Sequence, residues 1–432
     1  MESFNLPEDF LMGTATASLQ IEGGDKNNTW YKWCEEGHIK DGSHCITACD
    51  HWNRVEQDME LLLKLNVNTH RMSLEWSRIE PEKGEFSSEA TMHYRNEIKL
   101  LIKNGIKPLV TLHHFSEPLW FHEKGGWIKT GNSYYFLEFV KYVVEQLGDL
   151  VSDWVTFNEP NVYTKLGYIF GMWPPGIRKL SLSLSVYTEI IKAHLKAYDL
   201  IHSIRLKYGF EGKTMVGFAM HIRVFCGSTI MGRLLAKASD YFFHELYLEG
   251  MIRGRIKCPL SKKGYRYSKG TYVDFIGINY YTRNIVDFIF SPANLFHVLR
   301  NDNKLDKNDL GWDIYPEGIY YICKRYYEQY KLPIYITENG ISDKSDSKRP
   351  DFICSHLKNI EKAISNGIDI QRYYHWTLMD NFEWLEGEGA NFGLYRCNFK
   401  TQQRTIRNGG KLYSIICKDK KLTDEMIEEF LK

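Results

Sequence analysis

Apolar runs of strand-like composition alternate with amphipathic segments along most of the chain. The runs are rich in β-branched and aromatic residues and end at polar or turn residues, which is typical of strands buried on both faces of a parallel sheet. Eight runs are predicted as strands: Phe10–Ala17, Thr69–Trp76, Ile106–Phe115, Trp154–Asn158, Met215–Phe225, Val273–Tyr281, Ile334–Thr337 and Ile370–Leu378.

The segments between these runs repeat apolar residues at helical spacing. Ile190, Ala193, Ala197, Leu200 and Ile204 lie three or four positions apart and so share one helix face. The same pattern predicts helices at Arg54–Leu65, Glu89–Lys103, Tyr134–Leu147, Gly232–Leu248, Glu317–Tyr330 and His356–Ser365, and a structural helix at Thr423–Lys432.

This alternation predicts an α/β fold, the (β/α)8 TIM barrel, because eight parallel strands are the number that closes such a barrel. Barrels with long loops reach the length of this chain, so we expect one catalytic domain over residues 1–432. The longest strand-to-helix excursions, around 18–50, 283–312 and 380–410, are expected to form the pocket rim.

Composition argues against nucleic acid and membranes as partners, and it leaves the high aromatic content with two explanations. The formal net charge is +1, so nothing electrostatic points to nucleic acid or an anionic membrane. No apolar stretch reaches the roughly 18 residues of a membrane span. The N-terminal segment Met1–Pro7 lacks the features of a secretory signal, and we expect a cytoplasmic protein. Aromatic residues make up 14%, which fits either core packing or rings that stack on sugars.

The nine cysteines are odd in number and scattered among apolar neighbours, which favours free thiols in a reducing compartment. One cluster is open to a second interpretation, because thiols and imidazoles are zinc ligands. Its spacings are not of the paired C-x₂-C kind, so loop thiols and a separately used His51 are the simpler explanation. The members are Cys34, His38, His44, Cys45, Cys49 and His51.

Two of the predicted strands stop at a glutamate that is followed at once by a turn residue. Glu159 follows the fourth strand and Glu338 ends the seventh. Catalytic side chains of barrels lie at the C-terminal ends of strands, so both are expected in one pocket. A pair of facing carboxylates is what hydrolysis of a glycosidic bond requires. The structural alternative is that both glutamates cap helices or pair with arginines.

Other polar residues near strand ends fit the same chemistry. Arg71 lies inside the second run and must be paired if it points inward, either with a carboxylate nucleophile or in a structural ion pair. Gln20, His114 and Asn158 could meet sugar hydroxyls, although a satisfied core histidine is the default for His114. After the eighth strand, Asp380–Trp384 combines carboxylate, amide and indole groups, either as a sugar subsite or as an aromatic-rich loop.

These motifs, in this order, resemble glycoside hydrolase family 1, the β-glucosidase and β-galactosidase family. The resemblance covers nearly the whole chain. It is carried by Phe10–Gly23, Asp50-His51-Trp52, Arg71–Ile79, Thr111–Phe115, Asn158-Glu159-Pro160, Gly277–Tyr281, Ile336–Gly340 and Trp376–Trp384.

The resemblance implies a retaining β-glycosidase that uses no metal and no cofactor. Glu338 would be the nucleophile and Glu159 the acid/base. Arg71 and Tyr281 would orient and charge-balance the nucleophile, Asn158 would hold the sugar 2-hydroxyl, and Asn279 would lie close to the acid/base. The resemblance also implies a glycone subsite formed by Gln20, His114, Glu383 and Trp384, with Trp376 as its stacking floor and Phe392 near its edge.

Small-molecule β-glucosides or short oligosaccharides such as cellobiose are the expected substrates, with galactosides and fucosides as alternatives. A 6-phospho-β-glycosidase is the nearest rival, but members of that kind usually replace the Glu383-Trp384 pair. A catalytically inactive sugar-binding barrel is the rival of another class. Phe115, Asn161 and His70 depart from residues common in the family, and the first two bear on leaving-group preference. Trp312 weakly resembles a leaving-group-side position.

Overall fold

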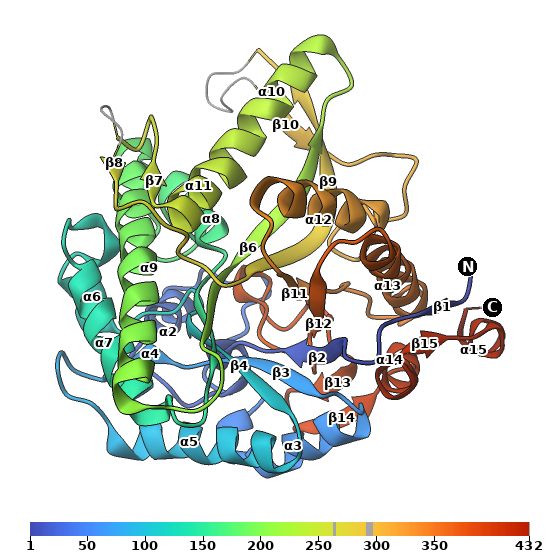
Figure 1. Ribbon diagram of the computed structural model, residues 1–432, viewed down its shortest axis with the longest axis horizontal. Coiled ribbons are helices and arrows are strands. Elements are labelled where there is room, and N and C mark those ends of the chain that lie inside the picture. The colour runs from blue at the N-terminus through green and yellow to red at the C-terminus, as the bar shows by residue number, and fades with distance from the viewer. Residues whose placement is uncertain (262–264, 291–296, 432) are drawn as a thin grey trace.

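The computed structural model describes residues 1–261, 265–290 and 297–431, and its centre is a closed barrel of eight parallel strands (Figure 1). Each strand pairs in parallel with the next, and β12 returns to β2 to close the ring. The barrel strands are β2 (Leu11–Ala15), β3 (Thr69–Ser73), β4 (Lys107–His113), β5 (Asp153–Asn158), β6 (Met215–Cys226), β9 (Ile276–Phe288), β11 (Ile334–Asn339) and β12 (Ile370–Trp376). The predicted fold class is therefore confirmed.

Each barrel strand is followed by at least one long helix on the outside of the sheet (Figure 1). These helices bury one apolar face against the strands, which gives the spacing seen in the sequence. They are α3 (Val55–Lys64), α5 (Ser88–Lys103), α7 (Ser133–Leu147), α9 (Leu180–Tyr208), α10 (Ile230–Asp240) with α11 (Leu246–Arg253), α12 (Glu317–Tyr330), α13 (Arg349–Ser365) and α14 (Asn408–Asp419).

Two helix predictions were too short. The helix expected over Gly232–Leu248 is α10 and α11 joined by a π-helical turn at Tyr241–Glu245, and together they span residues 230–253. The helix expected at His356–Ser365 begins at Arg349, because Pro350 lies in its first turn, where the missing N–H costs nothing. The tail helix is α15 (Asp424–Phe430), and Lys432 lies outside the described residues.

The sixth barrel strand was also predicted too short, and this changes the rim. The run expected at Val273–Tyr281 is β9, which extends to Phe288, so residues 283–288 are strand and not loop. The far end of β6 pairs with Arg283–Ile285, and β10 (His297–Arg300) pairs antiparallel with the other edge of β9. Residues 291–296 of the predicted rim lie outside the described residues. In Figure 1 these strand ends and α10 project from the barrel as an arm.

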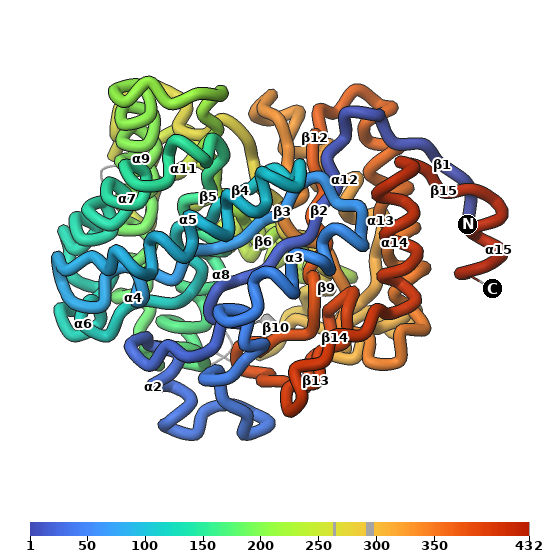
Figure 2. Tube along the Cα trace, turned by 90° about the horizontal axis from the view of Figure 1, so that it is seen from below, coloured from blue at the N-terminus to red at the C-terminus, as the bar shows by residue number. Residues whose placement is uncertain are grey.

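Short elements complete the rim and the base. The two chain ends meet where β1 (Phe4–Asn5) pairs with β15 (Lys421–Leu422), as both views show (Figure 2). The other short elements are α1 (Ser18–Ile21), α2 (Thr29–Glu35), α4 (Trp76–Ile79), α6 (Leu119–Glu123), α8 (Pro160–Thr164), β7 (Arg255–Ile256), β8 (Tyr265–Arg266), β13 (Tyr395–Asn398) and β14 (Gln403–Ile406). In the described part of the chain, no helix combines the length and apolarity needed to cross a bilayer.

Candidate active site

The two predicted glutamates lie at the same end of the barrel, each fixed by its own strand. Glu338 is the penultimate residue of β11, and Glu159 directly follows β5. Glu159 has a left-handed backbone with φ of 39°, a conformation that costs a non-glycine residue about 1–3 kcal/mol and is common at functional sites. Its N–H donates to the Ala219 carbonyl at 2.7 Å, so the neighbouring strand holds this turn in place.

Glu338 is clamped by two charge-stabilising donors. Arg71 Nη1 donates to Glu338 Oε1 at 2.6 Å, and the Tyr281 hydroxyl donates to Oε2 at 2.6 Å. Burial raises the pKa of Glu338 to about 7 and Glu159 adds to the rise, while Arg71 and Tyr281 oppose it. Arg71 is fully buried. Its pairing with Glu338 fits the carboxylate option that the sequence left open.

Glu159 has a different set of partners, all neutral. Asn279 Nδ2 donates to Glu159 Oε1 at 2.9 Å, and His221 Nδ1 lies 3.0 Å from the same oxygen. Arg223 donates to His221 Nε2 through Nε and Nη2, at 3.1 and 2.9 Å. An arginine can only donate hydrogen bonds, so His221 Nε2 accepts. The ring proton therefore lies on Nδ1, which donates a hydrogen bond to Glu159 Oε1. Glu159 Oε1 is thereby saturated with donors.

Burial raises the pKa of Glu159 to about 7, against Asn279, Arg223 and Arg71. Burial and then the charges of Arg223 and Lys165 depress the pKa of His221 well below its usual range, so this imidazole is neutral. Glu159 therefore lacks the direct ion pair that Glu338 has. Of the two carboxyl groups, Glu159 is the one whose surroundings favour a bound proton.

Asn158 joins the two carboxyl groups into one network. Its Oδ1 accepts from Arg71 Nη2 at 2.7 Å and from Asn279 Nδ2 at 3.0 Å, and its Nδ2 lies 2.9 Å from His114 Nε2. His114 Nε2 must therefore accept, which leaves the proton on Nδ1. His114 Nδ1 is buried and has no hydrogen-bond partner within the described structure, so a donor is left over in this wall.

A second polar wall comes from α1 and the loop after β12. Gln20 Nε2 donates to Asn381 Oδ1, the Phe382 carbonyl and Glu383 Oε2, at 3.1, 3.0 and 3.1 Å. Gln20 Oε1 and Asn381 Nδ2 are buried without a partner among the described residues. Burial raises the pKa of Glu383 to about 8, although its bond from Gln20 opposes the rise. Because buried polar atoms are nearly always paired, these unpaired groups mark a place for a polar ligand.

The aromatic residues predicted for the site border these polar groups. The rings of Trp376 and Trp384 are stacked with the His114 ring at centroid distances of 5.9 and 5.8 Å. The ring centroid of Phe392 lies 6.1 Å from that of Tyr281 and 6.1 Å from that of Trp312. The Glu383 carboxyl group also interacts with the Trp376 side chain, so all twelve residues predicted for the site belong to one connected set of contacts at the barrel mouth.

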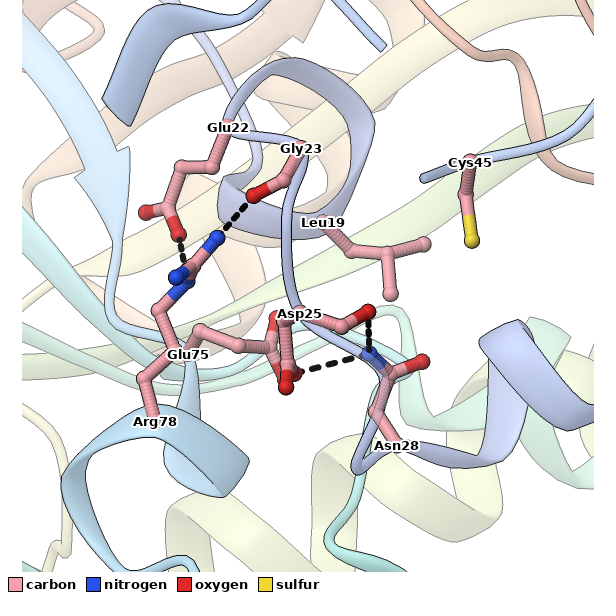
Figure 3. A pocket seen from close by; sticks show the side chains of 8 residues that line it. All are labelled: Leu19, Glu22, Gly23, Asp25, Asn28, Cys45, Glu75 and Arg78. Carbon is pink, nitrogen blue, oxygen red and sulfur yellow. Dashed lines mark hydrogen bonds and ion pairs between the residues drawn. The ribbon is translucent and has the colours of Figure 1, made fainter. Parts of the chain in front are cut away.

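A separate small cavity beside Leu19 and Gly23 is lined by three carboxyl groups, those of Glu22, Asp25 and Glu75 (Figure 3). Arg78 pairs with Glu22 at 2.7 Å, and Asp25 accepts from Asn28 and Ser77 at 2.8 and 2.6 Å. Burial raises the pKa of Glu75, which also lines the cavity, to about 8. The volume is about 10 Å³, too small for a sugar, so this cluster supports α1 and is not a substrate site.

The structure divides the cysteine and histidine cluster. The ring nitrogens of His51 lie 2.9 Å from Asp58 and 3.1 Å from Glu97. His51 therefore pairs with carboxylates and stands apart from the thiols, as the simpler explanation predicted. Ligand atoms of Cys34, His44 and Cys45 lie within 4.8 Å of one another. His44 Nδ1 already accepts from the Ile46 N–H at 3.0 Å, and its Nε2 contacts Glu35 at 3.0 Å. Both ring nitrogens are occupied, and we assign no metal here.

Two residues in contact with Glu159 or its partner were missed in the sequence, and a third, Asn161, was noted only as a departure. His221 and Arg223 lie on β6, where alternate residues face the barrel interior, and this alternation was the only available signal. Asn161 was noted as a departure from the usual residue, and its Nδ2 donates to the carbonyls of His221 and Phe243 at 2.8 and 3.1 Å. Asn161 thus ties the segment after Glu159 to β6.

Comparisons with known proteins agree on one family. The model of "Glycosyl hydrolase family 1" matches residues 2–422. The "Beta-glucosidase A" of Thermotoga maritima is 32% identical, with 97% of this chain and 99% of that protein covered. A "beta-glycosidase from Pyrococcus horikoshii" superposes with a TM-score of 0.91 at 36% identity, covering 99% and 98% of the two chains. A Thermotoga maritima β-glucosidase solved in complex with deoxynojirimycin has a TM-score of 0.89 at 31% identity, with 97% and 100% covered.

Proposed function

Because the chain belongs to glycosyl hydrolase family 1 and is a β-glycosidase, we propose that it acts as a retaining β-glucosidase, with Glu338 as nucleophile and Glu159 as acid/base. The observation that carries this assignment is the unequal setting of the two carboxyl groups. Glu338 is paired with a guanidinium, whereas Glu159 has only neutral donors on one oxygen. One group is prepared to stay ionised and the other to hold a proton.

In the first step, a Glu338 oxygen attacks the anomeric carbon of the sugar while the bond to the leaving oxygen breaks. Glu159 Oε1 is saturated by Asn279 and His221, so the acidic proton lies on Oε2 and passes from there to the leaving oxygen. As the glycosyl ester forms, Glu338 loses its negative charge, and its hydrogen bonds from Arg71 and Tyr281 weaken. Asn158 lies between the two carboxyl groups, where it can bind the sugar 2-hydroxyl.

In the second step, Glu159 takes a proton from a water molecule while the water oxygen attacks the anomeric carbon and the ester bond to Glu338 breaks. Glu338 leaves as a carboxylate and recovers its bonds from Arg71 and Tyr281. Two displacements at one carbon retain the configuration. Proton nuclear magnetic resonance of the first-formed sugar tests this directly: β-glucose is expected, and α-glucose as the initial product would contradict the scheme.

The polar wall supports glucose as the preferred sugar. Gln20 Oε1, Asn381 Nδ2 and His114 Nδ1 supply an acceptor and two donors beside Glu383, and the rings of Trp376 and Trp384 offer apolar faces. Hydroxyl groups on a pyranose can satisfy all of these atoms at once. We expect p-nitrophenyl β-glucoside to be hydrolysed faster than the matching galactoside and fucoside.

Two rivals are tested by the same assay. A 6-phospho-β-glycosidase needs a cation near the sugar 6-position, whereas Glu383 places a carboxyl group in this wall. Hydrolysis of the 6-phosphorylated glycoside in preference to the plain glucoside would favour that rival. An inactive sugar-binding barrel would bind both and hydrolyse neither, and the intact Glu338 clamp argues against it.

A further inference from the structure

Two cationic side chains beyond Glu159 contact the same aromatic ring and influence each other electrostatically. Lys165 lies in the π-helical turn Lys165–Ile169, which follows α8, and Arg223 lies on β6. Both face the Phe243 ring: Lys165 Nζ is 4.9 Å and Arg223 Cζ 5.6 Å from its centroid. Both residues are half-buried. The Asn161 amide, bonded to the carbonyls of His221 and Phe243, holds the elements that carry them together.

Neither cation has a carboxylate partner. Among the residues that the structure describes, no carboxylate oxygen lies within the 4.0 Å ion-pair distance of Lys165 or Arg223. Arg223 bonds only to neutral groups, namely His221 Nε2 and, at 2.9 Å, Asn284 Oδ1. Within the described part of the chain, the Lys165 ammonium contacts the rings of Phe243 and Phe170 and no carboxylate. By contrast, Arg283, whose strand position pairs with Val224, forms an ion pair with Asp302.

Keeping these two partly buried side chains charged costs free energy when no anion lies nearby. Burial, followed by the charge of Arg223, lowers the pKa of Lys165 to about 8, and burial lowers that of Arg223 to about 10. Among the described residues, the ionised Glu159 is the negative charge that offsets Arg223. When Glu159 holds its catalytic proton, the two cations are left uncompensated, and a negative group of another molecule would then be stabilised most.

The position of the cations specifies which molecule that would be. Glu159 delivers its proton to the leaving oxygen, so the leaving group lies on the Glu159 side of the bond that breaks. From Glu159 the contacts run outward to His221 and then to Arg223, while Lys165 follows Glu159 through α8. The sugar wall of Gln20, His114 and Glu383 contributes none of these contacts. The cations therefore face the leaving group and not the sugar.

We propose that Lys165 and Arg223 form an anion-binding subsite for the leaving group, and that the preferred substrates are β-glucosides whose leaving group carries a carboxylate or a phosphate. Arg223 offers a planar fork suited to either anion, and Lys165 offers a single point charge. This inference rests on the proposed function, because it assigns the leaving-group side from the role of Glu159.

The test compares three aryl β-glucosides on each enzyme: those of 4-hydroxybenzoate, of 4-phosphonophenol and of the neutral 4-hydroxybenzamide. The neutral amide is the better leaving group than the ionised acid, so a preference for the acid cannot come from chemical reactivity. We expect kcat/KM to be higher for at least one anionic glucoside than for the amide. The anionic glucoside with the higher value shows whether the subsite prefers a carboxylate or a phosphonate, which stands in for the phosphate.

The ratio of anionic to neutral kcat/KM is then measured in three variants. Lys165→Met should reduce the ratio by about tenfold to a hundredfold, the usual value of one charge-assisted contact. Lys165→Arg keeps the charge and should retain most of the ratio. Lys103→Met, an exposed lysine on α5, is the matched control and should leave it unchanged. A ratio measured on one enzyme is insensitive to a loss of folded protein.

The outcomes separate the two claims. If the amide is hydrolysed at least as well as both anionic glucosides by the unaltered enzyme, or if Lys165→Met leaves the ratio unchanged, the subsite is refuted while the β-glucosidase assignment stands. If none of the three glucosides is hydrolysed, the proposed function fails, and the subsite fails with it.

Discussion

The two sides of the bond to be cleaved are built with opposite charge. On the sugar side lie the carboxyl groups of Glu338 and Glu383 and one guanidinium, that of Arg71, which pairs with Glu338. On the leaving-group side, Lys165 and Arg223 lie together without a carboxylate partner in the described structure. Glu159 stands at the boundary between them. In the proposed scheme, the sugar side controls the chemistry, and the leaving-group side is left to control the choice of substrate.

The two sides also differ in how they are held. Glu338, Arg71 and Asn158 lie on barrel strands, so the closed sheet fixes their positions. Lys165 lies on the π-helical turn after α8, and Phe243 lies on the one between α10 and α11. Such turns are frequent at functional sites. Substitutions on the sugar side should thus cost turnover, and those on the leaving-group side should change which substrate is preferred.

The largest effect is expected where the sugar side forms its covalent bond. Glu338→Ala should reduce kcat by a factor on the order of 10⁴ to 10⁶, as removal of a nucleophile does in other enzymes. Azide should restore activity by attacking from the vacated side, and the product should be the α-glucosyl azide. Glu328→Ala, an exposed glutamate on α12, is the control. Turnover of Glu338→Ala near the unaltered rate would place the nucleophile elsewhere.

The next effect tests the boundary residue. Glu159→Gln removes the acidic proton, and general acids contribute about 10²- to 10⁴-fold. The loss in kcat/KM, which reports the first step, should be large for alkyl glucosides, whose leaving oxygen needs the proton, and small for dinitrophenyl glucoside, whose leaving group departs as an anion. Steady-state kinetics on both substrates gives the comparison. Equal losses on the two would show that Glu159 does not protonate the leaving group.

A smaller effect is expected from the sugar wall. Glu383→Ala removes a carboxyl group that accepts from Gln20 and faces the unpaired atoms beside it. The expected fall in kcat/KM for p-nitrophenyl β-glucoside is about tenfold to a hundredfold, the value of one hydrogen bond to a charged group. The ratio of anionic to neutral leaving groups should not change. A changed ratio would mean that the two sides are not separate.

The smallest effect is a shift in pH dependence. The proposed scheme requires ionised Glu338 and protonated Glu159, so a bell-shaped profile is expected. Burial raises the pKa of Glu159 to about 7, and activity should fall as the pH rises through that region and the acidic proton is lost. Arg223 lowers this pKa, so Arg223→Gln should move the alkaline limb of kcat/KM to higher pH.

Arg396→Gln, an exposed arginine on β13, is the matched control and should leave the limb in place. A shift of the Arg223→Gln limb to lower pH would contradict the assigned contact. A flat profile from pH 4 to 9 would contradict the division of roles between the two carboxyl groups.

The sequence could bring the proposed sugar-side residues together because most of them lie within or directly after barrel strands. Chain order alone brought Glu159 and Glu338 to one end of the barrel, and the contacts of Arg71, Asn158 and Gln20 agree with that placement. Strand boundaries were less accurate. The extension of β9 to Phe288 was missed because it depends on pairing with β6 and β10, which local composition does not reveal.

The leaving-group side could not be predicted in the same way. Lys165, Arg223 and Phe243 come from three separate segments, none of which ends a barrel strand with a recognisable motif. A lone lysine or arginine in an amphipathic segment is normally solvated, and only the structure shows that these two lie together without a carboxylate. The hydrogen bonds of Asn161 likewise became interpretable only when β6 and the π-helical turn were placed.

The central claim, that Glu338 forms the bond to the sugar, is tested most directly by trapping the glycosyl enzyme. Incubation with 2-deoxy-2-fluoro-β-glucosyl fluoride slows the second step more than formation of the ester, so the labelled enzyme accumulates. Peptide mass spectrometry should find one 2-fluoroglucosyl group on the peptide that contains Glu338. A label on Glu159 or on another residue, or an enzyme that hydrolyses the reagent while no label forms, would contradict the assignment.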